Sequence, residues 1–147
     1  MTAIDTNVII DLDTGTQEVA EAALGALEQA GARGRMVVCG IVFAELCAHP
    51  SWTAEVLRDV LSAARIEIAS DLSLDVWFRA GDAYAIYARR RRRERGDAPR
   101  RIVADFVIGA HAQTVGSLVT NDTAFYRRCF PDLPLTAPSV HPNARHL

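Results

Sequence analysis

The sequence predicts an α/β fold in a single domain, in which a central parallel sheet carries helices on both faces. Short apolar segments typical of buried strands alternate along the chain with longer segments of helical periodicity. Acidic residues follow several apolar segments directly, at the place where an open parallel sheet binds its ligands. The length of 147 residues suits one domain with a substantial core.

The composition is that of a soluble globular protein, with 50% hydrophobic and 23% charged residues. The longest apolar run, Met36 to Ala44, is far shorter than the roughly 20 residues that span a membrane. No signal peptide is evident, so we expect a cytoplasmic protein that does not contact a membrane. All 16 basic residues are arginine, and the absence of lysine excludes a P-loop and a Schiff-base enzyme.

The first third of the chain is expected to form two strands and three helices. A first strand ends at Asp5, and Asn7 is the expected N-cap of the helix that follows. Residues 16–31 are rich in alanine and leucine at helical spacing, and glycines end this helix. Met36–Cys39 then form a buried strand, and Ile41–Ala48 a short helix that a proline closes.

The middle third is expected to form a helix, a short strand and a long helix. In the first of these, residues 52–64, Val56 and Val60 lie on one face. Ile66–Ile68 alternates as a strand does. The long helix, capped by Asp71 or Ser73, runs into an arginine run. Its predicted core stripe consists of Leu74, Trp77, Gly81, Tyr84 and Ala88.

The last third begins with a helix over residues 102–115, which is apolar nearly all round and should be buried. Asp105 is its only acid. A strand, a short helix and an edge strand are expected to follow at residues 117–120, 124–129 and 133–136. We expect the domain to span residues 1–137, and residues 138–147 to form a flexible C-terminal tail.

Four acidic residues form the candidate site. Asp5 and Asp122 follow predicted strands, and Glu45 lies in the short helix after another. These three should converge on the carboxyl edge of a parallel sheet, and Asp105 can join them from the start of its buried helix. A divalent cation would relieve the repulsion between four carboxylates in one crevice.

The ligand chemistry favours a hard ion. Oxygen-only ligands suit Mg²⁺ or Mn²⁺, and no set of histidines and cysteines accompanies them to bind zinc. Such an ion activates water and polarises a phosphoryl oxygen, so hydrolysis of phosphodiester bonds is the predicted chemistry. The three cysteines, Cys39, Cys47 and Cys129, and His111 are interpreted as core residues.

The same acids lie in motifs that resemble those of PIN-domain ribonucleases. The match runs in order from Asp5 to about Pro134, and so covers most of the chain. The matching motifs are Asp5-Thr6-Asn7, Ala44-Glu45-Leu46, Asp105 with the following Phe106-Val107-Ile108-Gly109-Ala110, and Thr120-Asn121-Asp122.

Small single-domain PIN proteins are mostly VapC-type toxins of toxin–antitoxin pairs. The resemblance therefore implies a PIN-like fold and a Mg²⁺-dependent endoribonuclease that forms a homodimer and is blocked by a small antitoxin protein. It also implies that Thr120 supplies a hydroxyl that supports the site, and that Asn7 is the polar residue beside the first acid. The catalytic metal ligands that it implies are Asp5, Glu45, Asp105 and Asp122.

The residues leave other functions open. A PIN-fold module could bind RNA or protein without cutting, although the presence of all four acids argues against it. A nuclease could act on DNA, because the ion and the carboxylates suit either polymer. A phosphotransfer receiver domain would need a late lysine, which the sequence lacks. Many PIN relatives carry a further acid after the last motif, where this chain has Thr123, Ala124 and Phe125, which leaves a second metal site open.

The arginine run is a second candidate site. The segment from Arg79 to Arg101 carries nine arginines against three acids, or +6, whereas the remainder carries −8. A solvated helix end would explain the run, and so would a docking surface for an acidic antitoxin segment. We favour contact with RNA, because arginine binds phosphate bidentately and an acidic crevice needs positive charge nearby. The predicted RNA-binding residues are Arg89, Arg90, Arg91, Arg92 and Arg93.

Overall fold

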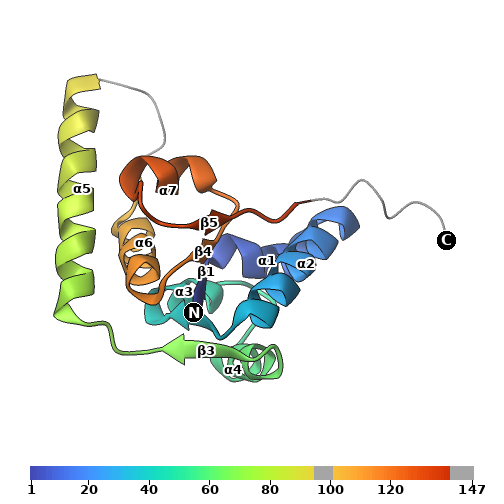
Figure 1. Cartoon of the computed structure of the whole chain (residues 1–147). Helices are drawn as coiled ribbons and strands as arrows, with labels where there is room; N and C mark the ends of the chain where they lie inside the picture. The colour runs from blue at the N-terminus through green and yellow to red at the C-terminus, as the bar shows by residue number, and fades with distance from the viewer. Residues whose placement is uncertain (95–100, 140–147) are drawn as a thin grey trace.

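A computed structural model describes residues 1–94 and 101–139 of the chain (Figure 1). The strands are β1 (Thr2–Ile4), β2 (Met36–Cys39), β3 (Ile66–Ala69), β4 (Leu118–Val119) and β5 (Leu135–Thr136). The helices are α1 (Thr6–Thr14), α2 (Gln17–Arg33), α3 (Gly40–Leu46), α4 (Ala54–Ala63), α5 (Leu74–Glu94), α6 (Val103–Val115) and α7 (Thr123–Cys129).

The strands form one sheet in the order β3-β2-β1-β4-β5, and every neighbouring pair is parallel. The chain first builds outward from β1 through β2 to β3, and then returns to add β4 and β5 on the other side of β1. The strand order therefore reverses between β1 and β4, where Ala3 pairs with Leu118. In open α/β sheets such a switch point forms a crevice at the carboxyl ends of the strands.

Helices lie on both sides of the sheet, as predicted. In Figure 1, α5 and α6 stand to the left of the strands and α1 and α2 to the right. Helix α6 contacts β1 on one side and α5 on the other, and its residues from Phe106 to Ala112 are buried. This confirms the sequence prediction of a buried helix.

Two helices bury a different face from the one predicted. In α4, Leu57 and Leu61 are buried, whereas Val56 and Val60 are 46% and 42% exposed. Both pairs have helical spacing, and the packing of α4 against β3 selects the leucines. The valine face is therefore left to solvent.

The predicted core stripe of α5 is also wrong. Leu74 and Trp77 are 66% and 45% exposed, whereas Val76 and Ala80 are the buried residues of this helix. Gly81 and Tyr84 of the predicted stripe are exposed as well, and Ala88 is half-buried. Val76 and Ala80 turn inward because α5 packs closely against α6, and farther along the helix the rings of Tyr84 and Tyr87 contact Phe106 of α6.

Smaller differences concern the helix ends. Helix α1 begins at Thr6, so its N-cap is Asp5 and not Asn7 as predicted. Helix α2 continues to Arg33 before Gly34 ends it. Ser73 rather than Asp71 caps α5, since its hydroxyl accepts a hydrogen bond from the backbone N–H of Val76.

The predicted core residues lie mostly inside. His111 and Cys39 are buried, while Cys47 and Cys129 are half-buried against the core, and all three cysteines are free thiols. None of the helices in the described residues is long and apolar enough to cross a membrane. Most of the predicted tail, residues 140–147, lies outside the described residues.

Candidate functional site

The site is built around Asp5, at the carboxyl end of the central strand β1. Its backbone N–H donates to the carbonyl of Val119 in the neighbouring strand β4, which continues the sheet pairing for one residue. Its side chain caps α1, because one carboxylate oxygen accepts the backbone N–H of Thr6 at 2.8 Å. The other oxygen accepts the hydroxyl of Thr120 at 2.6 Å and the side-chain amide of Asn7 at 3.0 Å. Asp5 is thus held at the switch point of the sheet.

The environment of Asp5 disfavours its charge. Burial raises the pKa of its carboxyl to about 6, and the nearby charges of Asp105 and Glu45 add to this effect. The hydrogen bonds from Thr120 and from the backbone of Thr6 act in the opposite direction. An unpaired carboxylate in this position would be stabilised by a bound cation.

Glu45 reaches the site from α3, which begins directly after β2. Its carboxylate accepts the hydroxyl of Thr6 at 2.5 Å, so Thr6 donates to two acids, to Asp5 through its backbone N–H and to Glu45 through its side chain. This glutamate therefore has a polar partner in its apolar surroundings. The partner is a neutral hydroxyl rather than a cation.

Asp105 and Asp122 both lie at helix N-termini. In the first turn of α6, the Asp105 carboxylate accepts the backbone N–H of Ile102 at 3.3 Å. Asp122 caps α7 by accepting the backbone N–H of Phe125 at 3.3 Å. Burial raises the pKa of Asp105, and the charge of Asp122 adds to this, while the same hydrogen bond from Ile102 and the charge of Arg101 oppose it. Helix N-termini favour such negative charges.

All four acids line one cavity of about 410 Å³, which we call the acidic cavity. It lies at the carboxyl ends of β1 and β4. Besides the acids Asp5, Glu45, Asp105 and Asp122, its lining consists of Thr6, Asn7, Ile10, Ala48, Arg101 and Tyr126. The structure thus brings together residues that are up to 121 positions apart in the sequence.

Thr120 and Asn7 connect the two strand ends. The Thr120 hydroxyl donates to Asp5 and accepts the backbone N–H of Asp122 at 3.0 Å, so it bridges two acids. Asn7 donates to Asp5, and its side-chain oxygen accepts the backbone N–H of Asn121 at 3.1 Å. Thr120 is fully buried, and these contacts fix the orientation of the Asp5 carboxylate.

The chemistry of the cavity fits a hard divalent cation. Its lining residues offer carboxylate, hydroxyl and amide oxygens and neither histidine nor cysteine, and the pKa values of two of the acids are raised. However, no three histidine, cysteine, aspartate or glutamate side chains within residues 1–94 and 101–139 stand close enough to hold an ion together. Thr6 holds Glu45, and Arg101 holds Asp122. An ion bound to Glu45 or Asp122 would therefore compete with these two contacts.

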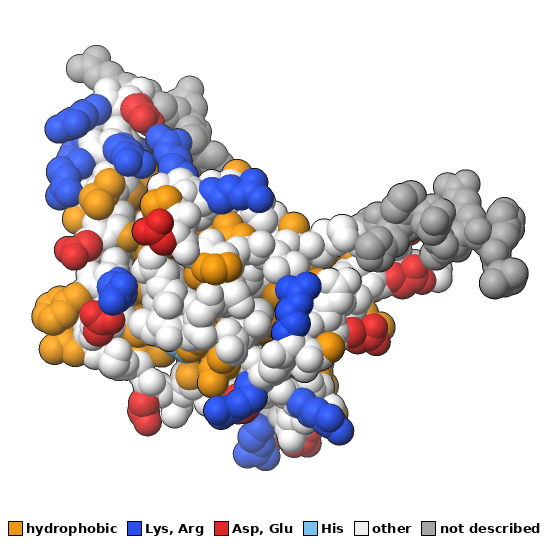
Figure 2. Space-filling model, in the orientation of Figure 1, with side chains coloured by type: hydrophobic (Ala, Val, Ile, Leu, Met, Phe, Trp, Pro, Cys, Tyr) orange, Lys and Arg blue, Asp and Glu red, His pale blue; other side chains and the backbone are white. Residues whose placement is uncertain are grey.

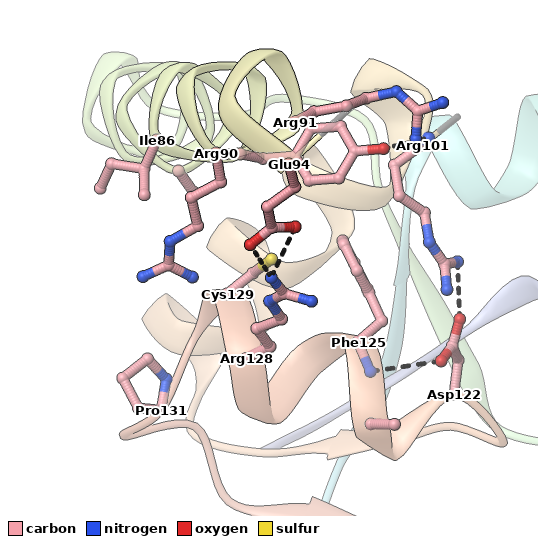
Figure 3. Close-up of a pocket in the computed structure, with 13 residues that line it drawn as sticks. Ile86, Arg90, Arg91, Glu94, Arg101, Asp122, Phe125, Arg128, Cys129 and Pro131 are labelled. Carbon is pink, nitrogen blue, oxygen red and sulfur yellow. Dashed lines mark hydrogen bonds and ion pairs between the residues drawn. The ribbon is translucent and has the colours of Figure 1, made fainter. Parts of the chain in front are cut away.

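The arginine run lies beside a second, larger hollow. This α5–α7 groove of about 620 Å³ shares Arg101 and Asp122 with the acidic cavity (Figure 3). Its arginines are Arg90 and Arg91 from α5, Arg101, and Arg128 from α7. Figure 2 shows basic side chains gathered at this end of α5. Of the five predicted RNA-binding arginines, Arg90 and Arg91 therefore face the groove, Arg92 lines a shallower hollow beside it, and Arg89 and Arg93 are exposed outside the groove lining.

Three polar residues of the acidic cavity were not predicted from the sequence. Thr6 lies inside the first motif but was given no role. Tyr126 is buried against Asp5, and burial together with the negative charges of Asp5 and Asp105 raises the pKa of its phenol, which stays protonated. Arg101 pairs with Asp122 at 2.6 Å. The position of Tyr126, one helical turn after Asp122, was the only sequence signal for its role.

Comparison with known proteins identifies a family and a fold. The PIN domain family model matches residues 2–131 of the chain. The fold is similar to that of VapBC2 from Rickettsia felis, a complex solved with a DNA fragment from its promoter, with a TM-score of 0.68 and 21% identity over 92% of this chain and 97% of that one. VapBC-1 from nontypeable Haemophilus influenzae gives a TM-score of 0.59 and 19% identity over 92% and 96%. No curated protein matches the chain.

Proposed function

Since the chain belongs to the PIN domain family, we propose that it is a divalent-metal-dependent endoribonuclease that hydrolyses phosphodiester bonds in RNA. The observation that carries this proposal is the acidic cavity, in which four carboxylates from separate segments line one hollow at the switch point of the sheet. The oxygen-only ligand set favours Mg²⁺ or Mn²⁺.

The residues of the acidic cavity would have different roles in this reaction. Asp5, Glu45, Asp105 and Asp122 would hold the ion, which when bound activates water and neutralises charge on the phosphoryl group. Thr120 and Asn7 orient Asp5 through their hydrogen bonds. Tyr126 stays a neutral phenol beside Asp5, because burial and two carboxylates oppose its ionisation, and so it keeps a proton available for a hydrogen bond.

The arginines of the α5–α7 groove favour a polyanionic substrate. Arg90, Arg91 and Arg128 face it, and it joins the acidic cavity at Arg101 and Asp122. A strand whose phosphate lies in the acidic cavity could continue along the groove, where guanidinium groups bind phosphates bidentately. Such backbone contacts carry no sequence information, so they suit any RNA sequence.

A cleavage assay tests the nuclease. Purified protein is incubated with tRNA, rRNA, mRNA and single-stranded DNA, with Mg²⁺ or with EDTA, beside Asp105→Asn and the control Asp59→Asn, an exposed acid outside the cavity. We expect RNA cleavage that EDTA and Asp105→Asn abolish and that Asp59→Asn leaves intact. Cleavage of DNA alone would favour a DNA nuclease, and RNA binding without cleavage would favour a non-catalytic module.

We also propose that the protein is a cytoplasmic toxin, a homodimer inhibited by a small antitoxin. The similarity in fold to VapBC proteins supports this role. Large exposed apolar side chains on α5, among them Leu74, Trp77 and Phe78, support a protein-binding surface. Expression of this protein alone should slow bacterial growth, and co-expression of a small antitoxin encoded by the neighbouring gene should restore growth. Harmless expression of an RNA-cleaving protein would contradict the toxin role.

A further inference from the structure

Arg101 occupies the junction between the acidic cavity and the α5–α7 groove. Its backbone N–H donates to the phenol oxygen of Tyr87 at 2.9 Å, and this hydrogen bond fixes the backbone of Arg101 against α5. Its guanidinium lies 2.6 Å from a carboxylate oxygen of Asp122 (Figure 3). The same guanidinium lies over the ring of Phe125, with 4.4 Å between its central carbon and the ring centroid. An aromatic face and a carboxylate thus hold one cation in place.

The pairing sets Asp122 apart from the other acids of the cavity. Both of its carboxylate oxygens already have a donor, one the guanidinium of Arg101 and the other the backbone N–H of Phe125. Within the described part of the chain, by contrast, Asp5 and Glu45 accept only hydroxyl and amide donors, which are neutral. A divalent cation bound to Asp122 would meet the positive charge of Arg101 at the same oxygen, and the two cations would repel.

We propose that Arg101 is a built-in counter-ion of the acidic cavity, which competes with the metal ion for Asp122 and binds a substrate phosphate once the metal has displaced it. This rests on the proposed function. The displaced guanidinium stays at the junction, because the hydrogen bond from the backbone of Arg101 to Tyr87 keeps this residue in place. From there it faces the groove that also contains Arg90 and Arg91. Metal binding therefore converts Arg101 from a partner of a carboxylate into a partner of a phosphate.

The first test measures metal affinity without RNA. Mn²⁺ binding to the full chain is followed by calorimetry for wild type, Arg101→Gln, Arg101→Lys and Arg79→Gln. The last is a matched control, since Arg79 forms an ion pair of 2.7 Å with Asp75 on the exposed side of α5, outside the cavity. A partly exposed ion pair is worth enough to change binding by up to about fivefold, so we expect Arg101→Gln to bind Mn²⁺ about fivefold more tightly.

The controls separate this inference from the proposed function. Arg101→Lys keeps the charge and should bind Mn²⁺ nearly as wild type does, and Arg79→Gln should not differ from wild type. If wild type and Arg101→Gln bind Mn²⁺ equally, the counter-ion role is wrong while the metal site stands. If neither binds Mn²⁺, the proposed function itself is wrong. Circular dichroism of each variant verifies that it is folded.

The second test measures phosphate binding with adenosine 5′-monophosphate, which carries a phosphate but no internucleotide bond to cleave. In wild type, Mn²⁺ should strengthen nucleotide binding, because it frees Arg101 as well as adding its own charge. In Arg101→Gln, nucleotide binding in the presence of Mn²⁺ should be several-fold weaker than in wild type, even though the metal binds more tightly. Equal nucleotide affinity of the two proteins would overturn the phosphate role.

Discussion

At the scale of single residues, Thr120 links two acids of the acidic cavity. Its hydroxyl joins Asp5 and the backbone of Asp122, and so it spans the gap between β1 and the loop after β4. The residue is fully buried, so water from the solvent cannot replace either hydrogen bond. Threonine at this position therefore serves the site as well as the fold.

Thr120→Val should weaken the site while keeping its shape. Valine has nearly the same volume but no hydroxyl, so a buried carboxylate loses a donor, which costs about 1–3 kcal/mol of stability. The loss also raises the pKa of Asp5 further, since the Thr120 hydrogen bond now lowers it. Urea denaturation and Mn²⁺ titration would measure both effects. Thr120→Ser keeps the hydroxyl, and a similar loss in that variant would contradict this role.

At the scale of elements, helix N-termini explain how the fold tolerates four clustered acids. Asp5 caps α1, Asp122 caps α7, and Asp105 lies in the first turn of α6. Each helix directs unpaired backbone N–H groups and the positive end of its dipole toward its acid. Three helix starts therefore converge on the acidic cavity and offset part of the repulsion between its carboxylates.

Helix α6 approaches Phe130 closely at a glycine, Gly109. A Cβ atom on Gly109 would lie 2.2 Å from the ring of Phe130, which is itself buried. Gly109→Ala should therefore destabilise the protein by about 1–3 kcal/mol through overpacking. The matched control is Gly81→Ala in α5, where a Cβ would meet nothing within 4 Å, and which should stabilise by about 0.5–1 kcal/mol. Chemical denaturation distinguishes the two, and equal effects would refute the close contact.

Helix α5 divides the arginine run between the groove and solvent. Arg90→Ser with Arg91→Ser should weaken RNA binding alike for all sequences, because both residues face the groove beside Asp122. The slope of log affinity against log salt should flatten by roughly 0.7 for each phosphate of a single strand that no longer has an arginine partner. Arg89→Ser with Arg93→Ser removes the same charge outside the groove lining and should change the slope less. Equal slopes in both double variants would assign RNA binding to net charge alone.

At the scale of the whole molecule, the site lowers the stability of the metal-free fold. The folded-state pKa of Asp5 is about 6, above the ordinary value of 3.8, so the folded protein holds a proton that the unfolded chain releases. The contribution of Asp5 to the stability of the fold is therefore most favourable below pH 4, and it is lost as pH rises through about 6. The full penalty is about 3 kcal/mol.

In EDTA, urea denaturation at pH 4.5 and pH 7 should detect this cost. Between these two pH values, the free energy of unfolding of Asp5→Asn should fall by about 2 kcal/mol less than that of wild type, because the asparagine cannot ionise. Mg²⁺ or Mn²⁺ should restore the stability of wild type at pH 7, since the ion binds only the folded state. Asp122→Asn should reduce that gain. An identical pH dependence for wild type and Asp5→Asn would show that Asp5 ionises freely.

The order of residues along the chain was enough to predict the fold class, the strands, the buried helix α6 and the four acids as candidates. These features are local: a run of apolar residues, a helical period, or an acid at the end of a strand is readable within about ten positions. The Asp-Thr-Asn and Thr-Asn-Asp motifs lie at two such strand ends, which made Asp5 and Asp122 recognisable without any knowledge of their neighbours.

Packing in three dimensions, by contrast, selects which faces are buried and which residues meet. Helix α5 carries two apolar faces, and its packing against α6 buries Val76 and Ala80 rather than Leu74 and Trp77. The order of the strands places Thr120 against Asp5, 115 positions earlier, and Arg101, two residues before α6, pairs with Asp122. Such contacts depend on the free energy of the whole packed arrangement, and no local pattern in the sequence encodes them.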